Sequence, residues 1–165
     1  MSEVIDSRRA VPALEAARAA ARAAGLPYAG SVPPRDAWAL VQAEQAVLVD
    51  VRSAEERKFV GQVPEGPGIK HVAWATGTSL IRNPRFVREL EAKVRKDEPV
   101  LLLCRSGKRS AQAAEAAAKA GFTQVFNVLE GFEGDNDAAG QRGHSGGWRF
   151  HGLPCRLPDP FPIPT

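Results

Sequence analysis

The sequence has few of the residues that would indicate an unusual environment or partner. Its 165 residues include only two cysteines and three histidines, and the net charge is +3. Two cysteines are too few for a disulfide scaffold, and this small charge does not require nucleic acid as a partner. No segment approaches the roughly 18 consecutive apolar residues of a membrane span. We therefore expect a cytoplasmic protein with neither nucleic acid nor membrane as a partner.

The histidines and the N-terminal segment exclude two further classes. His71 and His144 have no paired spacing with other ligands, so a metal site is not expected. Arginines alternate with alanines between Arg9 and Arg22, which leaves no apolar stretch of the signal-peptide type.

The chain length favours one compact domain with tails. We expect a helical arm at residues 1–32, a main domain at 33–157 and a proline-rich tail at 158–165. Residues 133–147 form a glycine-rich insertion within the main domain. Long loops in compact domains are often functional, so this insertion is a candidate either to close over the site or to dock an acceptor protein.

Short apolar segments alternate with helical patterns along the main domain. Strands are predicted at 47–51, 69–74, 100–103 and 125–128. Helices are predicted at 12–24, 33–44, directly after Ser53, at 83–95 and at 110–120. This order predicts an α/β fold, a three-layer sandwich in which helices flank a central, mainly parallel sheet.

Cys104 follows the strand predicted at 100–103 and lies just before a predicted helix. Ligands of open α/β sheets bind at this carboxyl edge, where loop N–H groups and a helix N-terminus attract anions. Arg105, Lys108 and Arg109 add positive charge. Such surroundings stabilise a thiolate, so we predict that Cys104 is a nucleophile. The alternative, a buried cysteine beside a solvated helix start, leaves the gathering of cations unexplained.

Three segments of the chain resemble the rhodanese family of sulfurtransferases. They are VLVDVRSAEE at 47–56, LLLCRSGKRSAQAA at 101–114 and AGFTQVFNVLEGF at 120–132, in matching order and spacing. The resemblance implies a rhodanese-like three-layer sandwich. It also implies that Cys104 takes a sulfane sulfur from an anionic donor such as thiosulfate, holds it as a persulfide and passes it to cyanide or a thiol. No cofactor besides this covalent persulfide is implied.

An anion cradle is expected around the predicted nucleophile. Its expected members are Arg105, Ser106, Gly107, Lys108 and Arg109. The two arginines are expected to bind the oxyanion of the donor, since guanidinium groups match such oxygens in geometry. Gly107 is expected to adopt a positive φ in the tight loop.

Three further residues match acidic and basic positions of the family and are expected to support the site. They are Asp50 and Arg52 after the first strand, and Glu130 before a glycine. A structural ion-pair network that fixes the loops is the favoured interpretation of these residues, with a direct role near the crevice as the alternative.

The spacing of the loop separates the candidate activities. Cys104 and Arg109 are spaced as C-x4-R, whereas the related phosphatases have C-x5-R, so arsenate or phosphate chemistry is disfavoured. The cationic loop is similar to the thiosulfate-using branch rather than the mercaptopyruvate-using one. A persulfide carrier or protein-binding module without turnover remains the alternative to an enzyme. Cys155 is a candidate resolving thiol, although a bystander role is favoured.

Overall fold

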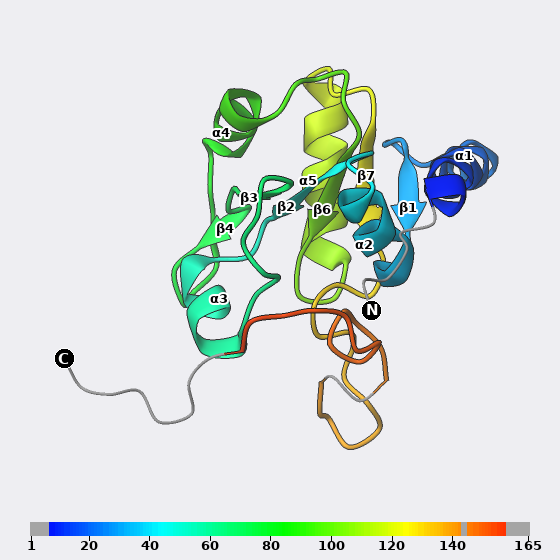
Figure 1. The fold of residues 1–165 in the computed structure, drawn as a ribbon. Coiled ribbons are helices and arrows are strands. Elements are labelled where there is room, and N and C mark those ends of the chain that lie inside the picture. The colour runs from blue at the N-terminus through cyan, green and yellow to red at the C-terminus, as the bar shows by residue number, and fades with distance from the viewer. Residues whose placement is uncertain (1–6, 143–144, 158–165) are drawn as a thin grey trace.

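A computed structural model describes residues 7–142 and 145–157, and its centre is a parallel sheet (Figure 1). The sheet order is β1-β7-β6-β2-β3, and every neighbouring pair is parallel. The strands are β1 (Gly30–Val32), β2 (Val47–Asp50), β3 (Ile69–His71), β6 (Val100–Leu103) and β7 (Val125–Val128). Every residue of β6 and β7 is buried, as expected for strands covered on both faces.

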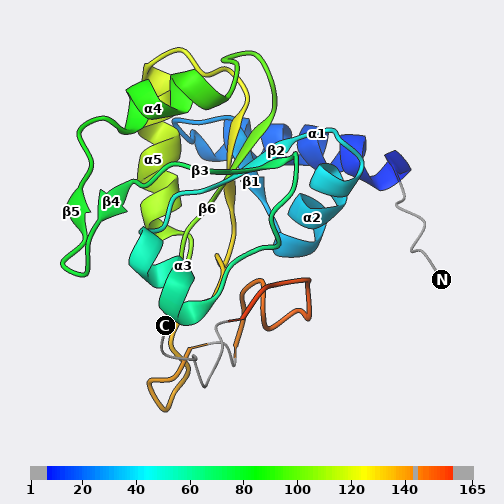
Figure 2. The same ribbon diagram turned by 60° about the vertical axis from the view of Figure 1, so that its left-hand side comes forward.

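Helices cover both faces of this sheet. Figure 2 shows α4 and α5 on one side, with α1 and α2 on the other. The helices are α1 (Ser7–Ala24), α2 (Pro34–Gln42), α3 (Ala54–Val60), α4 (Phe86–Lys93) and α5 (Lys108–Lys119), and a small hairpin comprises β4 (Ala75–Thr76) and β5 (Ile81–Arg82). The expected α/β class, with helices flanking a parallel sheet, is therefore confirmed.

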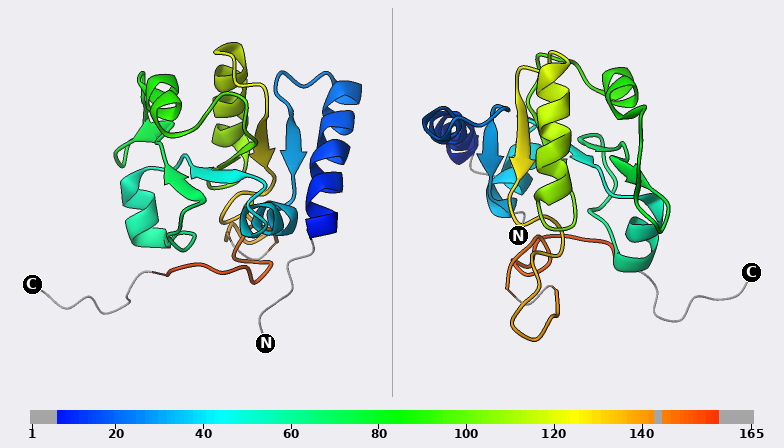
Figure 3. Two further views of the ribbon diagram at one scale, coloured as in Figure 1. Left: turned by 45° about the horizontal axis from the view of Figure 1, so that its top comes forward. Right: turned by 180° about the vertical axis from the view of Figure 1, so that it is seen from behind.

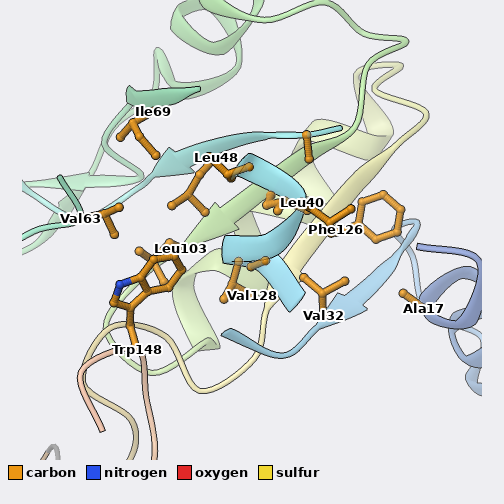
Figure 4. Close-up of a cluster of buried hydrophobic side chains, with 14 of the residues drawn as sticks. Ala17, Val32, Leu40, Leu48, Val63, Ile69, Leu103, Phe126, Val128 and Trp148 are labelled. Carbon is orange, nitrogen blue, oxygen red and sulfur yellow. The ribbon is translucent and has the colours of Figure 1, made fainter. Parts of the chain in front are cut away.

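Two apolar clusters lie on opposite faces of the sheet, because successive strand residues alternate between faces. Leu101 and Leu103 belong to the cluster under α1 and α2, which also contains Phe126 and Trp148 (Figure 4). Leu102 and Cys104 belong to the cluster under α4 and α5. The backbone alternation of β6 therefore directs Cys104 to the α5 side.

Several element boundaries differ from those predicted. The strand predicted at 69–74 ends at His71, the helix predicted at 83–95 covers only Phe86–Lys93, and α5 begins at Lys108 instead of Ser110. Strand β1 was not predicted, and it extends the sheet by pairing with β7. Helix α1 begins at Ser7, before Pro12, and docks on the domain through the buried side chains of Leu14, Ala17 and Ala21.

The described parts of the glycine-rich insertion, residues 133–142 and 145–147, lie beyond the carboxyl edge of the sheet, and residues 148–157 follow them there (Figure 3). Gln62 and Arg156 form an isolated antiparallel bridge that ties the C-terminal segment to the end of α3. His144 and the tail predicted at 158–165 lie outside the described residues. Among the residues that are described, no helix is long and apolar enough to cross a membrane, and no cluster of candidate metal ligands occurs.

Candidate active site

The sulfur of Cys104 lies at the carboxyl end of β6, where the chain turns back toward it. The residue is 1% exposed, and its Sγ accepts a hydrogen bond from the Gly107 N–H at 3.0 Å. Gly107 has φ 96°, in the left-handed region that glycine tolerates, as expected from the sequence. It is also the N-cap of α5, so the positive end of the helix dipole lies beside the loop. The geometry suits an anionic sulfur.

A second polar contact to the sulfur comes from α5 and is supported by β7. Cys104 Sγ lies 3.1 Å from Ser110 Oγ, which donates to Asn127 Oδ1 at 2.5 Å. The Asn127 side-chain N–H donates to the Gly107 carbonyl at 3.1 Å. One buried amide thus holds both groups that contact the sulfur. Ser110 and Asn127 were not predicted as site residues, although a polar residue in the buried strand VFNV was a signal, since buried polar groups require partners.

The two arginines of the expected cradle differ in their contacts. Both terminal nitrogens of Arg109 donate to the Glu56 carboxylate, each at 2.7 Å. Arg105 is half-buried, and its Nε is buried without a hydrogen-bond partner among the described residues. Arg109, expected to face the donor, is instead held by Glu56, whereas Arg105 keeps a free donor group.

Glu56 serves two elements at once. It is the third helical residue after Ser53, whose Oγ accepts the Glu56 backbone N–H at 3.2 Å, so the predicted helix start is confirmed. Burial opposes the charge of Glu56, but the hydrogen bonds and charge of Arg109 outweigh it and lower the pKa of the carboxyl. Burial likewise opposes the charge of Arg109, and Glu56 outweighs it, so the pKa of Arg109 is raised. Both groups are therefore charged at neutral pH.

The remaining cradle residues are more open. Ser106 is half-buried and Lys108 is exposed. Lys108 therefore contributes charge at the surface, while the Gly107 amide is the cradle group that contacts the sulfur.

Asp50 and Arg52 form a buried ion pair at the end of β2. Their side chains are 1% and 0% exposed, and Arg52 Nη2 lies 2.8 Å from Asp50 Oδ2. The same nitrogen donates to the Gly61 carbonyl at 2.9 Å, and the guanidinium lies 4.3 Å from the centroid of the Phe132 ring. Arg52 thus joins the end of α3 to the turn after β7, which agrees with the favoured structural interpretation.

Glu130 and the turn after β7 lie directly against the cysteine loop. The backbone N–H groups of Phe132 and Glu133 donate to the carbonyls of Cys104 and Arg105 at 2.8 and 2.9 Å. A Cβ on Gly131 would lie 2.5 Å from the carbonyl carbon of Arg105, so only glycine fits there. Glu130 Oε1 accepts from the Gly147 N–H and lies 2.9 Å from His151 Nε2, which links the turn to the segment beyond the insertion.

The second cysteine is not part of this arrangement. Cys155 packs against the cluster under α1 and α2, whereas Cys104 belongs to the opposite cluster. Both thiols are free. The bystander role favoured from the sequence stays a prediction.

Comparison with known proteins identifies similar chains. A family model described as rhodanese-like domain matches residues 33–138. Protein RP600 of Rickettsia prowazekii is 34% identical, over 67% of this chain and 89% of the relative. The thiosulfate sulfurtransferase GlpE of Actinobacillus succinogenes is 31% identical, over 62% of this chain and 80% of the relative. The match spans 54% of the length of two plant relatives.

A solved structure matches over most of its length. The crystal structure of Rv0390 from Mycobacterium tuberculosis has a TM-score of 0.70 and is 47% identical, with 78% of this chain and 98% of the other covered. The sheet, the flanking helices and the chain order are thus features that this protein shares with a known fold.

Proposed function

The chain belongs to the family of rhodanese-like domains, and from this premise we propose that it is a sulfurtransferase that carries sulfur on Cys104 as a persulfide. The observation that carries the proposal is the contact between the Gly107 N–H and Cys104 Sγ in a loop at the N-terminus of α5. Backbone N–H groups in this position stabilise a thiolate before transfer and a persulfide anion after it. A relative named thiosulfate sulfurtransferase supports thiosulfate as a donor.

The proposed reaction has two balanced steps. The Cys104 thiolate attacks the outer sulfur of thiosulfate, an S–S bond forms to Cys104, and the S–S bond of the donor breaks with its electron pair leaving on sulfite. Cyanide or a thiolate then attacks the outer sulfur of the persulfide, and the Cys104 thiolate leaves. Two substitutions at sulfur replace one difficult transfer, and neither requires a metal or another cofactor.

Arg105 is the proposed ligand for the oxyanion of the donor. Its buried Nε has no partner among the described residues, while Arg109 is bound at both terminal nitrogens by Glu56. A buried N–H without a partner is costly, and a bound oxyanion would remove that cost. The same contacts disfavour phosphate chemistry, since Arg109 is not free to hold a phosphoryl group.

A persulfide carrier without small-molecule turnover is the second candidate. Cys104 is nearly inaccessible, and the glycine-rich insertion begins next to the cradle, where Glu133 contacts Arg105. We propose the insertion at 133–147 as the docking site of an acceptor protein, and we propose a cytoplasmic location, because a persulfide cycle requires a reduced thiol. Small anionic donors and thiol acceptors are the remaining proposed partners.

Intact-mass measurement after incubation with thiosulfate tests the persulfide. The wild type should gain the mass of one sulfur atom, Cys104→Ala should gain none, and Cys155→Ala should behave as the wild type. Sulfur loading on Cys155 alone would overturn the assignment. Steady-state formation of thiocyanate from thiosulfate and cyanide then separates the candidates, because a loaded Cys104 without turnover would identify a carrier.

A further inference from the structure

The site contains a carboxylate that opposes the charge expected of an anion cradle. Glu56 lies on α3, outside the cysteine loop, and its carboxylate binds both terminal nitrogens of Arg109. The two side chains are each 16% exposed. A largely buried pair of this kind acts on its neighbours more strongly than a solvated one, because water screens it less.

We propose that Glu56 is a specificity-determining residue, whose negative charge disfavours sulfur donors in proportion to the negative charge that they carry. The inference rests on the proposed sulfurtransferase function and names the class of donor that the site prefers. Glu56 therefore lowers the rate of sulfur loading less for a monoanionic donor than for the dianion thiosulfate. In such a monoanionic donor the sulfane sulfur is bound to a sulfonyl or alkyl-sulfur group.

The other charges around Cys104 support this assignment. From β2, Asp50 and Arg52 neutralise each other as a buried pair. From the loop and α5, Arg105 has a free Nε, Lys108 is exposed, and Arg109 is neutralised by Glu56. Glu130, in the turn after β7, is partnered by His151. Arg105 therefore remains as the cation of the cradle that is both half-buried and not engaged in one of these pairs.

The pair also lies within electrostatic reach of the sulfur. Arg109 directly precedes Ser110, whose Oγ lies 3.1 Å from Cys104 Sγ, and the side chain of Cys104 contributes with Glu56 and Asp50 to the raised pKa of Arg109. Because Coulomb interactions are reciprocal, the charge of Arg109 acts on an anion at Cys104, and Glu56 weakens that attraction by neutralising Arg109. Removal of the Glu56 charge would leave Arg109 uncompensated beside the donor.

Glu56→Gln removes the charge and keeps the size of the side chain, while one of the two hydrogen bonds from Arg109 is lost. Glutamine suits the third position of this helix start as glutamate does, and its carbonyl still accepts a hydrogen bond from Arg109. Glu55→Gln is the matched control, since it removes the same charge from the preceding residue, whereas the carboxylate that pairs with Arg109 is that of Glu56. Thermal unfolding of both variants reports whether the fold is retained.

The test compares reagents of different charge at Cys104. Second-order rate constants are measured for sulfur loading by thiosulfate, a dianion, and by methanethiosulfonate, a monoanion, and for alkylation by neutral iodoacetamide. The pH is that at which alkylation has reached its alkaline plateau, so that all Cys104 is thiolate. Glu56→Gln should raise the rate constant of sulfur loading about tenfold for thiosulfate and about threefold for methanethiosulfonate. The rate constant of alkylation by iodoacetamide should not change. Glu55→Gln should change each rate constant less than twofold.

Two outcomes would overturn the proposal. If Glu56→Gln changes all three rate constants by the same factor, Glu56 only supports the loop. If the anionic donors react more slowly with Glu56→Gln, the charge of Glu56 does not disfavour them. Iodoacetate and iodoacetamide give a test that does not need sulfur transfer. If the wild type takes sulfur from neither donor, the proposed function fails. The role of Glu56 would still be supported if Glu56→Gln raises the ratio of the alkylation rate constants of iodoacetate and iodoacetamide about threefold. An unchanged ratio would refute that role.

Discussion

The ends of β2 and β6 are neighbours in the sheet, yet their charged groups serve different purposes. Asp50 and Leu103 are paired in the register, so both loops leave the same edge. After β2, Arg52 is fully buried against Asp50, Gly61 and Phe132. After β6, Arg105 is half-buried with a free Nε, and Cys104 receives a backbone N–H.

The two arginines are of one residue type but differ in the burial of the whole side chain. Arg52 also has one nitrogen without a hydrogen-bond partner, Nη1, but its side chain is 0% exposed and no donor can reach it. The unpartnered Nε of Arg105 is also buried, but Arg105 as a whole is only half-buried. An arginine that holds loops together and one that we propose to bind a ligand thus follow two adjacent strands.

Removal of Asp50 should give the largest effect, because it disrupts the buried ion pair at the end of β2. Asp50→Ala leaves the Arg52 charge buried without its partner, so the free energy of unfolding should fall by about 3 to 5 kcal/mol. Urea titration measures this loss. Asp97→Ala, which removes a carboxylate 80% exposed in its pair with Arg95, should change stability little. Equal effects of the two substitutions would contradict the structural role of the buried pair.

Gly107→Ala should damage both stability and chemistry on the β6 side. The backbone at φ 96° disfavours any side chain, so unfolding should become easier by about 1 to 3 kcal/mol, and the N–H that contacts Cys104 should move. Gly140→Ala is the control, since Gly140 has φ 79° with open space around it in the insertion. Both variants should lose stability, but only Gly107→Ala should lose sulfur loading in the intact-mass assay.

Substitution of Asn127 tests how the groups around the Cys104 sulfur are held in place. Asn127→Ala removes the partner of Ser110 and of the Gly107 carbonyl, so stability should fall by about 1 to 2 kcal/mol and sulfur loading should slow. If the side chain acts through Ser110, the loading rates of Asn127→Ala, Ser110→Ala and the double variant should not be additive. Additive losses of the loading rate in this double-mutant cycle would show that Asn127 does not act through Ser110.

The smallest expected effect concerns the pH dependence of the Glu56–Arg109 pair. Because the folded pKa of Glu56 is lowered, the pair stabilises the fold fully above the unfolded pKa of glutamate, near about 4.3, and the contribution disappears as pH falls through the lower folded value. The stability difference between wild type and Glu56→Gln, of about 1 kcal/mol or less at neutral pH, should therefore shrink in acid. Urea titrations from neutral pH into acid measure this difference in the free energy of unfolding. A difference that grows in acid would contradict the lowered pKa of Glu56.

The sequence predicted those features that depend on local pattern. The apolar segments that became β2, β6 and β7 were recognisable, and so were Cys104 at a strand end and the positive φ of Gly107. Strand β1 could not be recognised in three residues, because its pairing depends on β7 far along the chain. The engagement of Arg109 by Glu56 and the support of the sulfur by Asn127 were equally invisible, because each contact joins separate elements.

The sheet order has a consequence for how the chain folds. Gly30 pairs with Phe126, so the first strand of this sheet in chain order finds its partner only after β7, the last of the sheet, has left the ribosome. Such distant pairing slows folding, since the loop between the partners must close before the contact forms. We therefore expect β1 to join the sheet only after β7 has formed, and the N-terminal arm to be among the last parts of the domain to become protected from hydrogen exchange during folding.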